Sequence, residues 1–131
     1  MSEDLVKYSG GCHCGAVRWE AMGPQQIEAL RCNCSICSKA GYLELVVPEA
    51  RFTLLQGREA LTTYTFNSGV AQHHFCSTCG VKSFYIPRSN PDGVSLNINC
   101  FDEKPSNMTV SEFDGVNWEV LAHTLAERSK L

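Results

Sequence analysis

The sequence predicts a mainly β protein with one short helix near its C-terminus, and three observations point to this fold class. Short segments rich in β-branched and aromatic residues alternate polar with apolar side chains. Glycine, proline, asparagine and serine separate these segments. One late stretch changes to the spacing of an amphipathic helix. The 131 residues suffice for a single compact domain spanning 1–131, with its core at about 8–118.

The clearest strand is predicted at 16–21, where Val17, Trp19 and Ala21 share one face and charged residues occupy the other. Turn-forming residues separate this strand from the other predicted strands. The segment 87–93 contains two prolines and an Asp-Gly pair, which favours a surface loop. Six further strands are predicted at 43–47, 51–56, 61–66, 71–75, 82–86 and 94–98.

Two helical segments complete the expected elements. A short helical turn is predicted at 35–39, and a longer C-terminal helix at about 115–128. The longer helix would begin near Asp114 or Asn117, which are both suitable capping residues, and would pack across the sheet. Its apolar stripe has the spacing i, i+3, i+4 and i+7 and consists of Trp118, Leu121, Ala122 and Leu125.

Composition narrows the possible partners and the compartment. Lysine and arginine number 11 against 14 aspartates and glutamates, whereas a protein that binds nucleic acid needs a basic face. The apolar run 43–48 is far shorter than the ~20 residues that cross a bilayer, and the chain starts with acids rather than with a basic signal region. We expect a cytoplasmic protein without nucleic-acid or membrane partners. Its eight cysteines then serve as metal ligands or reactive thiols.

Four cysteines form a pair spaced by one residue and a pair spaced by two. Each pair can present two thiolates to one ion, and zinc prefers four such ligands in a tetrahedron. We expect this closed site to be structural, because it would connect segments more than sixty residues apart. Glycines flank both pairs and permit the tight turns that such ligands need. The four residues are Cys12, Cys14, Cys76 and Cys79.

Cys32, Cys34 and Cys37 form a third group that has only three ligands. Three protein ligands with an open fourth position are typical of a catalytic zinc. If a fourth residue of this chain also binds the ion, no position is open for a substrate, and the site is not expected to be catalytic. The candidates for that role are His13, His73, His74 and Cys100. Outside the clusters, Lys39 and Arg88 are either surface charges or groups that pair with carboxylates of a ligand.

The cysteine motifs resemble those of the glutathione-dependent formaldehyde-activating enzyme family, and in particular the centromere protein V domain. The resemblance begins with Gly-Gly-Cys-His-Cys-Gly-Ala-Val-Arg at 10–18 and Cys-Asn-Cys-Ser-Ile-Cys at 32–37. It continues with Phe-Cys-Ser-Thr-Cys-Gly at 75–80 and with later segments at 86–91 and 99–102. The similarity covers nearly the whole chain, from about Tyr8 to Trp118.

The resemblance implies a zinc-binding fold of the Mss4-like or β-tent kind and two zinc ions per chain. It places a structural zinc on the outer cysteine pairs and a catalytic zinc on the middle trio. The implied enzyme is a carbon–sulfur lyase that joins glutathione, its co-substrate, to formaldehyde as S-(hydroxymethyl)glutathione. The long basic N-terminal region of centromere protein V has no counterpart here, so chromatin and microtubule roles are not expected.

Two other functions fit the same residues. A zinc scaffold that binds another protein would have both ions fully enclosed by cysteine. A redox or metal sensor would form disulfides within the trio and release zinc. The enzyme hypothesis needs more than an ionised thiol, because ionisation at pH 7 gains only about 30-fold. Holding thiol and aldehyde together must supply the rest. The sequence does not predict the oligomeric state.

Overall fold

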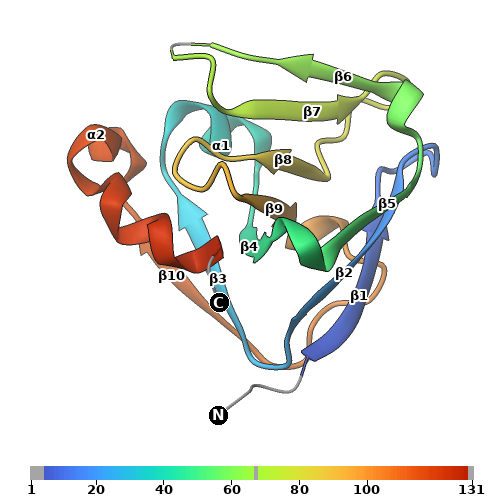
Figure 1. Cartoon of the computed structure of the whole chain (residues 1–131), viewed down its shortest axis with the longest axis horizontal. Coiled ribbons are helices and arrows are strands. Elements are labelled where there is room, and N and C mark those ends of the chain that lie inside the picture. Colours follow the sequence, from blue (N-terminus) through green and yellow to red (C-terminus); the bar gives the residue numbers. More distant parts are fainter. Residues whose placement is uncertain (1–4, 67, 130–131) are drawn as a thin grey trace.

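Ten strands in two sheets form the framework of the described residues, 5–66 and 68–129, in this computed structural model (Figure 1). The smaller sheet has the order β1-β2-β5 and is antiparallel. The larger sheet has the order β10-β3-β4-β9-β8-β7-β6, in which only β10 and β3 run parallel. The strands are β1 Leu5–Gly11, β2 Arg18–Pro24, β3 Ile27–Cys32, β4 Glu44–Pro48, β5 Phe52–Gln56, β6 Leu61–Tyr64, β7 Gln72–Cys76, β8 Phe84–Ile86, β9 Gly93–Asn97 and β10 Met108–Phe113.

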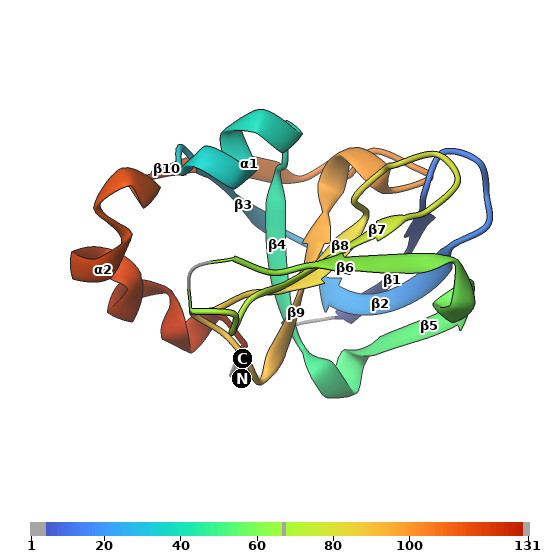
Figure 2. The same cartoon turned by 90° about the horizontal axis from the view of Figure 1, so that it is seen from above.

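Helices are short and lie outside the sheets. The α-helices are α1, Ser35–Ala40, and α2, Trp118–Leu121; α2 continues in a 3-10 helix at Ala122–Ser129. Both views place this C-terminal segment on the opposite side of the molecule from the small sheet (Figures 1 and 2). Within 5–66 and 68–129 no helix is long and apolar enough to span a membrane. Other 3-10 turns occupy Glu49–Arg51, Arg58–Ala60, Ile98–Cys100 and Gly115–Asn117.

The mainly β prediction is confirmed, and the arrangement fits the Mss4-like fold. All seven predicted strands are present with ends shifted by a few residues, but β1, β3 and β10 were not predicted. The β3 sequence is rich in helix formers, and pairing with β4 and β10 overrides that local preference. β10 is a largely exposed edge strand, and its alternation of apolar and polar residues extends only over residues 108–111.

A buried core joins the two sheets around Trp19 of β2. Trp19 is fully buried, its ring packs edge-on against Phe101, and its Nε1 donates a hydrogen bond to Ser83 Oγ at 3.1 Å. As predicted, Val17 and Ala21 are buried with it, whereas Arg18 and Glu20 are partly exposed. The core therefore holds the β1–β2 hairpin against the large sheet, which matters for the metal ligands in that hairpin.

The C-terminal helical segment is present where predicted, although most of it is 3-10 rather than α-helical. Its apolar stripe packs against Leu30 and Phe113 at the β3–β10 edge of the large sheet. Neither expected cap, Asp114 or Asn117, makes a side-chain capping hydrogen bond.

The loop at 87–93 corrects the expectation of a simple surface turn, because Asn90 within it is 1% exposed. Its Nδ2 donates hydrogen bonds to the carbonyl of Leu125 at 2.9 Å and to Ser129 Oγ at 2.9 Å. The loop thus anchors the C-terminal helical segment, and this segment forms one wall of the cavity described below.

Candidate metal centre and active site

The first cysteine pair lies in the turn between β1 and β2. The Cys12 amide donates to the Val17 carbonyl at 3.1 Å, and the Val17 amide donates back to Cys12 Sγ at 3.3 Å. Gly15 has a φ of 86°, and a Cβ on Gly11 would lie 2.0 Å from the Val17 carbonyl oxygen. Only glycine fits such positions without strain, as the sequence predicted for this turn.

The second pair lies in the turn after β7 and repeats this geometry. The Cys76 amide donates to the Val81 carbonyl at 3.1 Å, and the Gly80 amide donates to the Cys76 carbonyl at 2.8 Å. Gly80 has a φ of 76°, and the Thr78 amide donates to Cys76 Sγ at 3.4 Å. Amide donors of this kind stabilise a thiolate and fix its direction.

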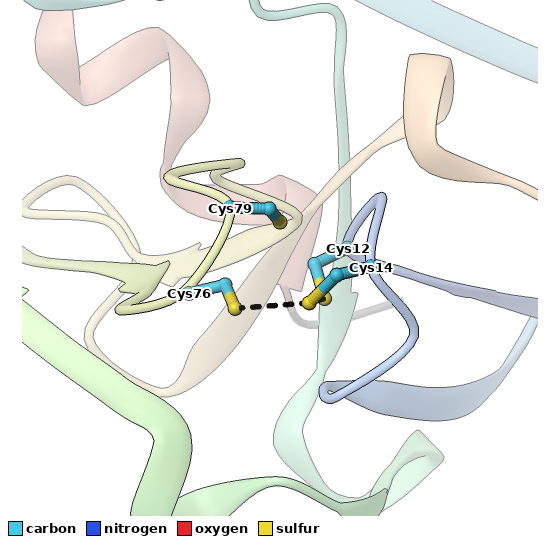
Figure 3. A group of neighbouring side chains, drawn as sticks. All are labelled: Cys12, Cys14, Cys76 and Cys79. Carbon is cyan, nitrogen blue, oxygen red and sulfur yellow. Dashed lines mark hydrogen bonds between the residues drawn. The ribbon is translucent and has the colours of Figure 1, made fainter.

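These two turns bring four sulfur atoms together (Figure 3). All four lie within 4.8 Å of one another, with 3.7 Å between Cys12 and Cys14 and 3.7 Å between Cys14 and Cys76. Four sulfurs at about 2.3 Å from a tetrahedral zinc are separated by about 3.8 Å. The donor set and its spacing fit zinc. The group consists of Cys12, Cys14, Cys76 and Cys79.

The middle trio is built at the junction of β3 and α1. Cys32 ends β3, Cys34 caps α1 by accepting from the Cys37 amide, and Cys37 is buried within the helix. Their three sulfurs lie within 4.8 Å of one another. Contacts with Cys32 and Cys37 lower the pKa of Cys34 to about 2, whereas contact with Cys34 raises the pKa of Cys32 to about 11. The trio offers three sulfur donors at a spacing that fits a metal ion.

No further histidine, cysteine, aspartate or glutamate among the described residues completes this trio. Neither the lone cysteine nor any of the three candidate histidines belongs to the group. His13 is exposed beside the other site, and His74 bonds through Nδ1 to Thr63 Oγ1 at 2.8 Å. Cys100 is half-buried, and its Sγ donates to the Lys82 carbonyl at 4.0 Å. His73 lines the same cavity as the trio without joining the group.

Gly115 passes directly over the trio. A Cβ at this position would lie 2.3 Å from Cys32 Sγ, 2.7 Å from Cys34 Cβ and 2.9 Å from the Cys34 amide nitrogen. The backbone at Gly115 thus closes one side of the three sulfurs, and no sequence motif indicated this contact.

Replacing Gly115 by alanine should therefore displace Cys32 and weaken metal binding at the trio about 10–100-fold, as changes beside metal ligands commonly do. Zinc titration against a competing chelator measures this affinity. Val116→Ala is the matched control, because Val116 is the next residue and is 74% exposed. If Gly115→Ala binds metal as tightly as the wild type, the contact has no role in the site.

The trio opens into a cavity of about 600 Å³. The cavity lies between the end of β3, the C-terminal helical segment and four residues near the start of β7, Phe66, Ser68, Ala71 and His73. None of the four cysteines of the other group lines it. Four sulfurs thus meet in the group that does not line this cavity, whereas three meet in the group that does. The walls are mainly apolar and include Leu30, Ile36, Phe66, Phe113, Val116 and Leu125.

Glu44 is a buried carboxyl group in the wall of this cavity, 7% exposed. Its Oε2 accepts hydrogen bonds from the Tyr85 hydroxyl at 2.7 Å and from Ser95 Oγ at 2.7 Å. Burial raises the pKa of Glu44 above its ordinary value, which makes its carboxylate a better proton acceptor. Sequence reasoning missed this residue because it occurs within an apolar strand without any motif.

His73 also lines the cavity and is 4% exposed. Its ring stacks on Tyr85 with centroids 4.9 Å apart, and its Nδ1 lies 2.7 Å from Lys82 Nζ. Burial, followed by the charge of Lys82, lowers the pKa of His73 to about 4. His74 is the next residue of β7, and only His73 of the two lines this cavity.

Arg88 lies at the cavity wall but already has partners. It forms a bidentate pair with Glu119 at 2.8 and 3.1 Å, and its guanidinium stacks over the Trp118 ring at 4.0 Å. Lys39, the other candidate for binding carboxylates, is exposed and does not line the cavity.

A family model described as glutathione-dependent formaldehyde-activating enzyme matches residues 7–113. The chain belongs to this family. A Halomonas elongata protein named "Putative glutathione-dependent formaldehyde-activating enzyme" is 35% identical over 78 residues, which are 53% of this chain and 50% of that protein. The chain thus spans about half the length of this curated relative.

A crystal structure of a Rhodobacter sphaeroides protein is also similar, with a TM-score of 0.65 and 33% identity. The match covers 72% of this chain and 87% of that one. The family shown by the match over residues 7–113 is the one that the cysteine motifs resemble.

Proposed function

We propose that the chain is a carbon–sulfur lyase that reversibly joins glutathione to formaldehyde or another small aldehyde. The observation that carries this proposal is the unequal environment of the two cysteine groups. The trio lines a cavity large enough for a small-molecule substrate, and the four-cysteine group does not. We also propose that the protein is cytoplasmic, as expected from the sequence, because the reaction requires reduced thiols.

Two zinc ions per chain belong to the proposal. Cys12, Cys14, Cys76 and Cys79 would hold the structural ion, and the trio would hold the catalytic one. When bound to three cysteines, zinc offers a fourth position that lowers the pKa of a substrate thiol.

The chain itself contributes a base and an enclosure. Glu44 accepts the proton that the thiol loses, because burial raises the pKa of its carboxyl group and it borders the cavity. The apolar walls exclude water and hold the thiol beside the aldehyde, which contributes several kcal/mol.

The direct test is the exchange rate between free glutathione, formaldehyde and their adduct, measured by NMR exchange spectroscopy. The adduct also forms without an enzyme, so the comparison with buffer is essential. We expect the protein to raise the exchange rate by about 1,000-fold or more, since positioning contributes several kcal/mol. A rate equal to that in buffer would leave the zinc scaffold as the function.

Replacing Glu44 by glutamine should lower the rate at pH 7 about 100-fold. The base must be ionised, so the wild-type rate should fall as the pH decreases through the raised pKa of Glu44, above the ordinary value of 4.5. The hydrogen bonds from Ser95 and Tyr85, followed by the charges of Arg128 and Lys82, limit this rise of the pKa. A pH–rate profile of kcat/KM measures the effect.

The glutamine variant should lack this acidic limb. Glu112→Gln is the matched control, because Glu112 is exposed and pairs with Arg31 at 3.1 Å away from the cavity. An acidic limb that persists unchanged in Glu44→Gln would assign the base to another group.

A further inference from the structure

His73 Nε2 is a buried nitrogen without a hydrogen-bond partner, and among the described residues it is the only buried side-chain nitrogen or oxygen in that state. Buried polar atoms are nearly always paired, so an unpaired one calls for an explanation. His73 lines the same cavity as the cysteine trio. A bound substrate can therefore supply the missing partner.

Lys82 determines which ring nitrogen carries the hydrogen. Its Nζ lies 2.7 Å from His73 Nδ1, and an ammonium group can only donate hydrogen bonds. Nδ1 is then the acceptor, so in the neutral ring the hydrogen is on Nε2. The lowered pKa of His73, about 4, keeps the ring neutral at pH 7. The unpaired atom is thus a donor.

Lys82 is itself fixed by aromatic rings. Its Nζ lies 4.0 Å from the Tyr85 ring centre and 4.9 Å from that of Tyr42. The His73 ring lies between Tyr85, at 4.9 Å and 16°, and Phe66, at 5.4 Å and 23°. These contacts hold the imidazole plane in one orientation. Phe66 itself is 41% exposed.

We propose that His73 is a catalytic residue that donates a hydrogen bond from Nε2 to the oxygen of the aldehyde. In the addition, a bond forms between the thiol sulfur and the carbonyl carbon, and the C=O π pair moves to the oxygen. The proton that leaves the thiol ends on that oxygen as the adduct hydroxyl, and the reverse reaction returns it. The donor stabilises the oxygen as negative charge develops there. This inference rests on the proposed function.

The test compares His73→Phe with His73→Gln in the zinc-loaded protein. Phenylalanine preserves the ring stack but removes the donor, so kcat for adduct exchange should fall about 100-fold with little change in KM. Glutamine can place an amide donor near the Nε2 position and should recover part of the rate. His74→Phe is the control on the opposite face of β7 and should retain the wild-type rate.

Two further measurements separate catalysis from structure. Zinc content and melting temperature should match the wild type in both His73 variants. In wild-type protein, ¹⁵N NMR should detect the Nε2–H tautomer of His73, and its signal should shift when glutathione and formaldehyde are added together.

The results of these experiments distinguish a failure of the His73 role from a failure of the proposed function. An active wild type with an equally active His73→Phe, or an unshifted Nε2–H signal, would overturn the role of His73 alone. A wild type no faster than buffer would overturn the proposed function and this role with it.

Discussion

Replacing Cys14 by serine is expected to remove one zinc ion and lower the melting temperature by about 15 °C or more. Cys14 is exposed, and a serine at an exposed position normally changes stability by no more than about 0.5 kcal/mol. A structural zinc contributes on the order of 10 kcal/mol to folding, which is comparable to the whole stability of a domain. Cys14 and Cys76 are 62 residues apart, so the ion would connect distant parts of the chain.

Metal analysis and thermal denaturation followed by circular dichroism measure both effects. Cys100→Ser is the matched control, because Cys100 belongs to neither group. This control should retain both ions and the wild-type melting temperature. A Cys14→Ser protein that melts with the wild type would show that the four sulfurs meet without holding a structural ion.

Replacing Cys34 by serine is expected to remove the other ion and reduce adduct exchange to the rate in buffer, while the fold persists. The trio spans only residues 32–37, so its ion closes a short loop and contributes little to folding. Cys34 caps α1 through its side chain, and serine is a good helix cap. The substitution therefore removes the thiolate and retains the local structure.

Metal analysis, thermal denaturation and the adduct-exchange assay test this variant. We expect one zinc per chain and a melting temperature within a few degrees of the wild type. A Cys34→Ser protein with wild-type exchange activity would refute a catalytic trio. A large decrease in the melting temperature would instead indicate that the trio has a structural role.

Cysteine spacing predicted which sulfurs meet, because spacing along the chain limits where two neighbouring thiolates can point. Alternating side chains likewise predicted β2 and its buried residues Trp19 and Ala21. The same reasoning failed for β3, in which helix-forming residues are held extended by strands from distant parts of the chain. Local patterns predict local geometry, and long-range pairing decides the rest.

The roles of three residues around the cavity could not be predicted from the sequence. Glu44, His73 and Gly115 come from three separate segments and belong to no motif. Glu44 is identified by its burial, His73 by its unpaired Nε2, and Gly115 by the 2.3 Å between a Cβ built on it and Cys32 Sγ. These features exist only in the folded chain. Asn90 is similar, because a turn-forming loop residue became a buried anchor once the C-terminal segment packed beside it.

The most direct test is a crystal structure of the zinc-loaded protein with bound glutathione, in which anomalous scattering locates the metal. The proposed function predicts two zinc ions with different surroundings. One should be bound by the sulfurs of Cys12, Cys14, Cys76 and Cys79, and the other by the trio together with the sulfur of glutathione. A single zinc ion, or a second ion whose four ligands all come from the polypeptide, would contradict a catalytic centre.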